Sequence, residues 1–154
     1  MTRSIDQPIP ADERLFHALL ADEVANEMIL HLALQMDGWI PRCSVWRQKY
    51  LAAPGDALKG KPGLIYVHLA VTRPRHLPPD VEVEVRNPNP RKSPQRRAYR
   101  FKAVDDPQPE DDAHAEIRAT RVEDGVVKVN SETAQNTLRV ELAARFRIFG
   151  EDEW

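Results

Sequence analysis

Cys43 and its neighbour Ser44 are the side chains of this sequence best suited to nucleophilic chemistry. A reactive thiol or hydroxyl needs a base or a cation beside it, and His68 and His114 are the imidazoles that folding could bring there. The spacing along the chain places neither histidine beside the sulfur. Because a cysteine flanked by tryptophans is typical of a small buried hydrophobe, the sequence favours a structural role for Cys43 over catalysis.

Carboxylates and imidazoles occur at three places where they could bind a metal ion, although no HExxH motif is present. Two of these places are Glu–His pairs four residues apart, a spacing that equally suits a surface hydrogen bond. The third combines a strand with an acidic loop, for which a solvated state is the simpler interpretation. The three groups are Glu13 with His17, Glu27 with His31, and His114 with Glu116 beside Asp111 and Asp112. A glycine-containing stretch at residues 55–63 lacks the complete P-loop pattern, so we predict no metal ion or cofactor.

The distribution of charge along the chain is its most distinctive chemical feature. Seven Lys or Arg residues and no acidic residue lie between positions 86 and 102, and five acidic residues follow between positions 105 and 112. Opposite patches on one subunit suit contact between neighbouring copies, in which each basic segment meets the acidic segment of the next copy. We predict that the partner-facing residues include Arg91, Lys92, Arg96, Arg97, Arg100 and Lys102 in the basic segment and Asp105, Asp106, Glu110, Asp111 and Asp112 in the acidic segment.

The N-terminal third of the sequence predicts one long helix over residues 10–37. Apolar residues recur every four positions along it, and a proline and a glycine stand where such a helix would begin and end. The part at residues 28–36 is apolar nearly all round, although it also alternates as a strand would. Because one sheet covers only part of a helix, we expect Leu30 and Leu34 to contact a partner.

After a transition segment at residues 38–63, the apolar period changes to two and predicts a β-rich region over residues 64–149. The alternating runs lie at 65–71, 81–85, 99–103, 115–119, 126–129 and 138–148. The last run is the longest and most regular, and in a helix its apolar residues would scatter around the axis. Half-buried strands need a cover on one face. We therefore predict an α+β fold in which the long N-terminal helix packs on a roughly six-stranded antiparallel, meander-like sheet or open barrel.

Length, charge and cysteine content limit the classes of protein to which the chain can belong. It has 154 residues, a formal net charge of −2 and one cysteine. The length favours a single domain over residues 1–154, with an acidic tail at residues 150–154. The balance of charge excludes a polycation that coats nucleic acid, and one cysteine excludes an internal disulfide. With no signal-peptide pattern and only short apolar stretches, we expect a protein of the cytoplasm, or of a particle assembled there, without membrane contact.

These features favour a non-catalytic structural or interaction subunit of a larger, homo-oligomeric assembly. At the level of fold alone, a small α+β unit with charged loops is analogous to the ring- or tube-forming proteins of bacteriophage tails. One alternative is a module that contacts nucleic acid through residues 86–102. The second alternative is a small enzyme with a pocket between helix and sheet, lined by Tyr66, His68 and either Trp39 or Trp46.

Overall fold

The computed structural model of the protein describes residues 2–25, 28–29, 35–37, 40–58, 66–85, 87, 89–125, 129, 132–150 and 153. Its strands are β1 (Leu15–Leu20), β2 (Val24–Ala25), β3 (Met28–Ile29), β4 (Gln35–Asp37), β5 (Ile40–Arg47), β6 (Tyr66–Thr72), β7 (Val81–Val85), β8 (Gln95–Asp105), β9 (His114–Arg121) and β10 (Arg147–Ile148). Its helices are α1 (Glu132–Ala143) and the short 3-10 turns η1 (Ala21–Glu23), η2 (Gln48–Tyr50), η3 (Pro54–Leu58) and η4 (Pro74–His76).

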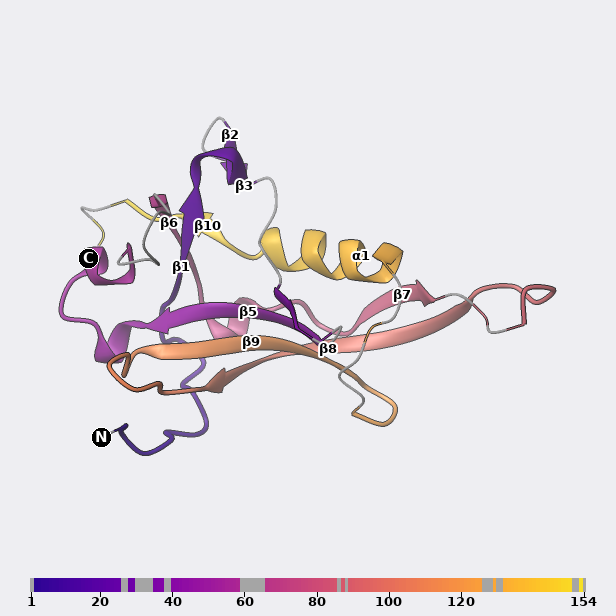
Figure 1. Ribbon diagram of the computed structural model, residues 1–154, viewed down its shortest axis with the longest axis horizontal. Coiled ribbons are helices and arrows are strands. Elements are labelled where there is room, and N and C mark those ends of the chain that lie inside the picture. The colour runs from indigo at the N-terminus through magenta and orange to yellow at the C-terminus, as the bar shows by residue number, and fades with distance from the viewer. Residues whose placement is uncertain are drawn as a thin grey trace.

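A curled antiparallel sheet forms half of a barrel and dominates the described part of the chain (Figure 1). Its strand order is β10-β6-β1-β5-β9-β8-β7, with β4 paired to β5 outside this path. The strands β2 and β3 form a separate small sheet. Within the described residues, no helix has the length and apolar character needed to cross a membrane.

The predicted long N-terminal helix is wrong, because residues 15–20 form β1 in the middle of the sheet. Both faces of this strand are covered. Leu15 and Leu19 pack in the main core, whereas Phe16 and Ala18 pack in a second apolar cluster on the other face. A strand covered on both faces loses its polar alternation and becomes a continuous apolar run, which periodicity cannot distinguish from a buried helix.

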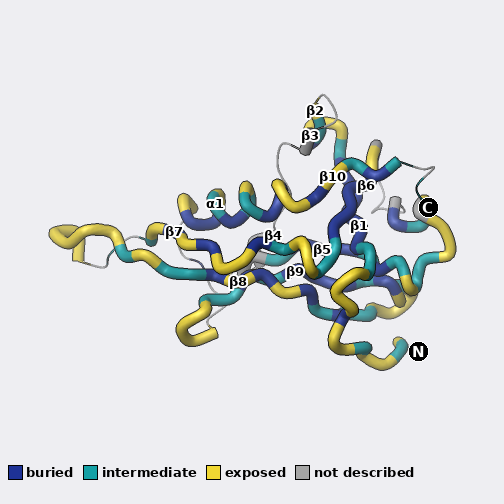
Figure 2. Tube along the Cα trace, turned by 180° about the vertical axis from the view of Figure 1, so that it is seen from behind, coloured by how far each residue is buried: buried dark blue, intermediate teal, exposed yellow. Residues whose placement is uncertain are grey.

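The second correction concerns the end of the chain, where the predicted final strand is mostly helix. Residues 132–143 form α1, and only Arg147–Ile148 form a strand there. Leu138 and Leu142, four residues apart, are fully buried, while Val140 between them is 63% exposed. α1 packs against β7 and closes the main core, with its buried side facing the sheet (Figure 2). The helix that covers the sheet therefore comes from the opposite end of the chain to the predicted one.

The prediction of an antiparallel sheet is confirmed. The alternating runs predicted at 65–71, 81–85, 99–103 and 115–119 correspond to β6, β7, β8 and β9. The sequence-based interpretation missed β5, which lies in the predicted transition segment and pairs with β1 and β4 along one edge and with β9 along the other. The inward-facing residues of β5 end in a charge, Arg47, after Cys43 and Val45. The predicted run at residues 126–129 lies outside the described residues except for Val129.

Two charged turns lie at the opposite ends of β8. The hairpin of β7 and β8 projects beyond the sheet (Figure 1), because β9 pairs with β8 only from Tyr99 onward. We call residues 87 and 89–94 at its end the arm tip. The Asn87 side chain accepts the amide N–H of Asn89 at 3.0 Å, which is a turn-forming contact. Residues 106–113, between β8 and β9, are called the acidic turn.

Candidate functional site

A buried guanidinium, that of Arg47 at the end of β5, is the centre of the largest group of charges among the described residues. Its Nε and Nη2 donate to the two carboxylate oxygens of Glu13, both at 2.7 Å, in the bidentate geometry that suits this pair. Its Nη1 donates to Oδ1 of Asp105 at 3.0 Å. The side chains of Arg47 and Asp105 have no exposed area, so their charges depend on these partners.

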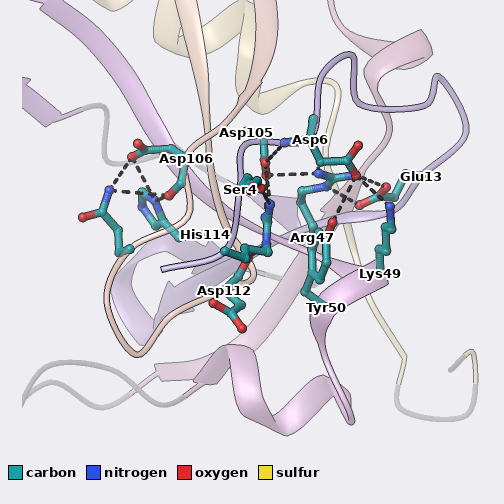
Figure 3. A network of polar contacts seen from close by, with 12 residues as sticks. Ser4, Asp6, Glu13, Arg47, Lys49, Tyr50, Asp105, Asp106, Asp112 and His114 are labelled. Carbon is teal, nitrogen blue, oxygen red and sulfur yellow. Dashed lines mark hydrogen bonds and ion pairs between the residues drawn. The ribbon is translucent and has the colours of Figure 1, made fainter. Parts of the chain in front are cut away.

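The N-terminal segment closes this group from outside (Figure 3). The guanidinium of Arg3 donates to both oxygens of Asp105 at 2.6 Å and lies 3.7 Å from the ring centroid of Tyr50. The backbone N–H of Asp6 also donates to Asp105, at 2.6 Å, and the Asp6 carboxylate accepts from Lys49 at 2.7 Å. The contacts join residues far apart in the chain around two charges that have no exposed area. Such an arrangement is typical of an interaction that stabilises the fold rather than of an open binding site.

The pKa values in this group follow from its contacts. Burial alone would raise the pKa of Asp105, but the hydrogen bonds from Arg3, from the Asp6 amide and from Arg47 outweigh burial and lower the pKa to about 2. Burial alone would lower the pKa of Arg47, but the bonds to Glu13 and Asp105 raise it instead. Arg47 and Asp105 therefore both stay ionised at neutral pH.

A second polar group lies on the outer face of β5, β9 and β8, where His114 is in register with Trp46 and Glu116 is in register with Ser44. Nδ1 of His114 lies 2.9 Å from the Asp106 carbonyl and 3.2 Å from its carboxylate. Both partners are acceptors, so Nδ1 carries a proton, and Nε2 lies 3.2 Å from the hydroxyl oxygen of Ser44.

The contact order Ser44–His114–Asp106 is that of an activated serine. Acyl transfer also needs hydrogen-bond donors for the oxyanion. Ser44 lies inside β5, and its carbonyl oxygen lies 2.7 Å from Nδ1 of His17 in β1. Because the contacts shown only orient the hydroxyl, we assign no acyl transfer to Ser44.

Cys43 is not placed beside either of the two histidines considered from the sequence. Its thiol is fully buried in the main core, and Sγ lies 3.5 Å from Nδ1 of His17. Burial raises the pKa of the thiol, and burial lowers the pKa of His17. A neutral thiol beside a neutral imidazole agrees with the structural role expected for Cys43, while His68 is exposed on β6.

Asp106, His114 and Glu116 each offer a metal-ligand atom, and these atoms lie within 4.8 Å of one another. The predicted His114–Glu116 pair is thus close, with Asp106 rather than Asp111 or Asp112 as its neighbour. The three side chains already have polar partners. Glu116 accepts from Arg118 at 2.8 Å, and the carboxylate of Asp106 accepts from His114. A divalent cation here would have to replace these contacts, so we assign none.

The predicted basic residues divide into those with acidic partners and those without. Arg96 pairs with Glu82 and Glu84 on β7, Arg97 lies 3.9 Å from Glu123, and Arg100 pairs with Asp80 at 2.8 Å. Lys102 is exposed on the outer face of β8. Within the described part of the chain, Lys102 and the exposed arm-tip residues Arg91 and Lys92 form no ion pair.

The predicted acidic residues divide in the same way. Asp105 is enclosed with Arg47, Asp106 contacts His114, and Asp111 accepts from the indole N–H of Trp46 at 3.1 Å. Glu110 and Asp112 are exposed in the acidic turn. The structure therefore does not gather the eleven charged residues into one surface. It leaves Arg91 and Lys92 exposed at the arm tip, Lys102 exposed on the outer face of β8, and Glu110 and Asp112 exposed in the acidic turn.

Other residues considered from the sequence are dispersed or lie outside the described residues. Leu30, Leu34, Glu27, His31 and Trp39 are outside them, as is most of the 55–63 stretch. Glu13 binds Arg47 and His17 contacts the Ser44 carbonyl, so the first Glu–His pair is not a shared site. Tyr66 and Trp46 pack against the second apolar cluster. The sequence-based interpretation missed the Arg47–Asp105 pair, for which an arginine at the inward-facing period of β5 was the available signal.

No protein-family model matches the chain, and no curated protein or solved structure is significantly similar to it.

Proposed function

We propose that this chain is an assembly subunit that joins copies of itself head to tail, with the arm tip of one copy against the acidic turn of the next. The observation that carries the proposal is the placement of the two charged turns at the two ends of β8. This strand runs from Gln95 to Asp105, a span of about 33 Å at about 3.3 Å per residue. The two turns of one chain are therefore too far apart to neutralise each other.

The charges available at each end are few and opposite. Arg91 and Lys92 are exposed at the arm tip, and Glu110 and Asp112 are exposed at the acidic turn. A contact between different surfaces of identical copies is heterologous, and its repetition closes into a ring or continues as a filament. This geometry supports the ring or tube type of assembly over a two-fold dimer.

Charge alone does not hold such an assembly together. Exposed ion pairs contribute about 0–1 kcal/mol each, whereas a micromolar contact requires about 8 kcal/mol. We therefore assign orientation and register to the four charges, and the main part of the affinity to apolar contact. The expected contribution of Leu30 and Leu34 is part of this proposal, and the exposed Val140 on α1 is a further apolar residue.

The pairing of basic residues argues against nucleic-acid contact through residues 86–102. Binding to phosphates requires cations that can exchange counterions for the nucleic acid. Arg96 and Arg100 are paired with carboxylates of the same hairpin region. Self-assembly through the arm tip needs only Arg91 and Lys92, which are unpaired within the described residues, and is compatible with ion-paired arginines along β8.

Charge reversal tests the proposal directly. A tip variant, Arg91→Glu with Lys92→Glu, has two negative ends, and a turn variant, Glu110→Lys with Asp112→Lys, has two positive ends. We expect each variant alone to remain monomeric by light scattering at 100 µM in low salt, whereas the wild type assembles. An equimolar mixture should assemble again, because every contact between the variants is complementary.

The matched control keeps the charge, with Arg91→Lys and Lys92→Arg, and should assemble as the wild type does. Assembly of the wild type should weaken as salt shortens the screening length from about 10 Å at 0.1 M to about 3 Å at 1 M. The proposal is contradicted if the wild-type protein stays monomeric at every salt concentration, or if the charge-reversed variants assemble as the wild type does.

A further inference from the structure

A hollow lined by cations lies at the end of the sheet where β10, β6 and β1 are neighbours. Its volume is about 240 Å³, and its lining includes His76 and the four arginines Arg14, Arg73, Arg145 and Arg147. It takes no part in the Arg47 group or in the arm tip. Neither the charge distribution nor the motifs of the sequence indicated it, because its arginines come from three distant segments.

The strand register explains why these arginines meet. Leu15 of β1 is opposite Thr72 of β6, so Arg14 and Arg73, one residue beyond, leave the two strands at the same end. The third segment follows α1 and enters β10 at Arg147, opposite Val71.

Local packing holds the third segment over the hollow. Phe146 is buried in the main core, which leaves Arg145 and Arg147 on its two sides facing outward. The Thr72 hydroxyl donates to the carbonyl of Arg145 at 2.7 Å, which fixes the backbone of this segment against β6. The hollow is therefore a consequence of the fold and not of a chance orientation of surface side chains.

The charges around the hollow are not balanced by the described residues. One carboxylate, that of Glu153, contacts Arg147 at 2.7 Å, and the Glu153 carbonyl accepts from Arg14 at 2.8 Å. Arg73 and Arg145 form no ion pair within the described part of the chain. Cations gathered in this way repel one another, and a bound anion removes the repulsion.

We propose that this hollow binds the phosphate group of a small phosphorylated molecule. Guanidinium groups present paired N–H donors that match phosphate oxygens, and several of them suit a group with more than one negative charge. The volume lies below the roughly 300–1,000 Å³ of sites that enclose whole drug-sized ligands. The hollow therefore accommodates a phosphate or pyrophosphate group and leaves the rest of the ligand outside.

Inorganic pyrophosphate is the probe for the test, added to the full chain at constant ionic strength and followed by isothermal titration calorimetry. We expect one binding site per chain, with affinity reduced about tenfold or more by Arg73→Ala and again by Arg145→Ala. The Arg100→Ala control removes an exposed arginine elsewhere and should bind as the wild type does. Glu153→Gln removes the competing carboxylate and should bind more tightly.

Thermal melting of each variant establishes that it is folded before its affinity is compared. The proposal is overturned if the folded wild type binds no pyrophosphate at millimolar concentration, or if Arg100→Ala weakens binding as much as Arg73→Ala does. Tighter binding by Glu153→Gln distinguishes binding in the hollow from general attraction to a basic surface. Glu153 contacts Arg14 and Arg147, which line the hollow, so its carboxylate competes with an anion bound there. This result does not depend on whether the chain assembles.

Discussion

Two opposite charges without exposed area, Arg47 and Asp105, join three segments that are far apart in the sequence. Arg47 ends β5, Asp105 ends β8, and the N-terminal segment supplies Arg3 and Glu13. Removing one member of a buried ion pair typically costs about 3–5 kcal/mol, because the other charge stays buried without its partner. At the residue scale, the position of the N-terminal segment therefore depends on ionisation.

The ionisation of Asp105 makes stability depend on pH in an acidic range. Its pKa falls from 3.8 to about 2 in the folded protein, so the carboxylate stabilises the fold above about pH 4. A tenfold change in proton affinity corresponds to about 1.4 kcal/mol, so this contribution amounts to about 2 kcal/mol and is lost as the pH falls from about 4 to about 2. Urea unfolding across this range should show the loss in the wild type, and Asp105→Asn should lack that part of the dependence. Identical slopes in both proteins would contradict the ion-pair account.

Glu110 in the acidic turn has a backbone conformation that favours glycine, with φ at 64°. A side chain in the left-handed region costs about 1–2 kcal/mol. We therefore expect Glu110→Gly to raise the free energy of unfolding by about 0.5–1 kcal/mol, measured by denaturant unfolding at low protein concentration. Asp112→Gly, at an ordinary φ, should lower stability instead, because glycine there only increases the freedom of the unfolded chain. Equal effects of the two substitutions would show that the conformation at Glu110 carries no strain.

At the scale of the element, the pattern of apolar and polar residues in a segment depends on whether one face or both faces of the element are buried. β8 alternates buried and exposed residues over most of its length, and α1 buries residues four apart. β1 is buried on both faces because the main core covers one face and the second apolar cluster covers the other. The periods of two and of 3.6 residues therefore describe half-covered elements only.

The helical identity of α1 has a direct test in two neighbouring positions. Leu138 is fully buried and Val140 is 63% exposed, whereas in a strand the two side chains would share a face. We expect Leu138→Asp to lower the stability by several kcal/mol or to prevent folding, because it places an unpaired charge in the core. Val140→Asp should change stability by only about 0.5 kcal/mol, as surface substitutions do. Comparable losses in thermal melting would favour the strand.

The sequence therefore allowed a correct prediction of the half-covered strands and failed at the elements whose cover comes from elsewhere in the chain. β7, β8 and β9 alternate because one face meets the core and the other is at least partly exposed to solvent, whereas β6 is buried on both faces from Leu69 to Thr72. The five residues from Leu138 to Leu142 fit both periods, and the burial that distinguishes them depends on the distant β7. β5 was missed because its inward-facing positions end in Arg47, a charge whose burial depends on partners from other segments.

The charged residues show the same limit. The basic and acidic segments were visible as runs of like charge, but their partners across the sheet were not. Arg96 meets Glu82 and Glu84 only because β7 and β8 pair in a particular register. The arginines of the hollow beside β10 come from three segments, so no run of charge marks them.

At the scale of the whole molecule, β8 separates two turns of opposite charge. The arm tip and the acidic turn lie beyond its two ends, and the core with α1 lies between them (Figure 1). A body with complementary ends is suited to repeated contact between copies. The cationic hollow lies beside β10, at the edge of the sheet opposite to β7.

The most direct test of head-to-tail assembly is a zero-length carbodiimide cross-link in an equimolar mixture of ¹⁴N- and ¹⁵N-labelled protein. About 33 Å of β8 separates the two charged turns within one chain, so a cross-link from Lys92 to Glu110 or Asp112 can form only between copies. Head-to-tail assembly predicts this peptide pair, with mixed isotopes, in low salt and a lower yield of it in 1 M salt. Absence of the pair in a mixture that light scattering shows to be assembled would contradict the account.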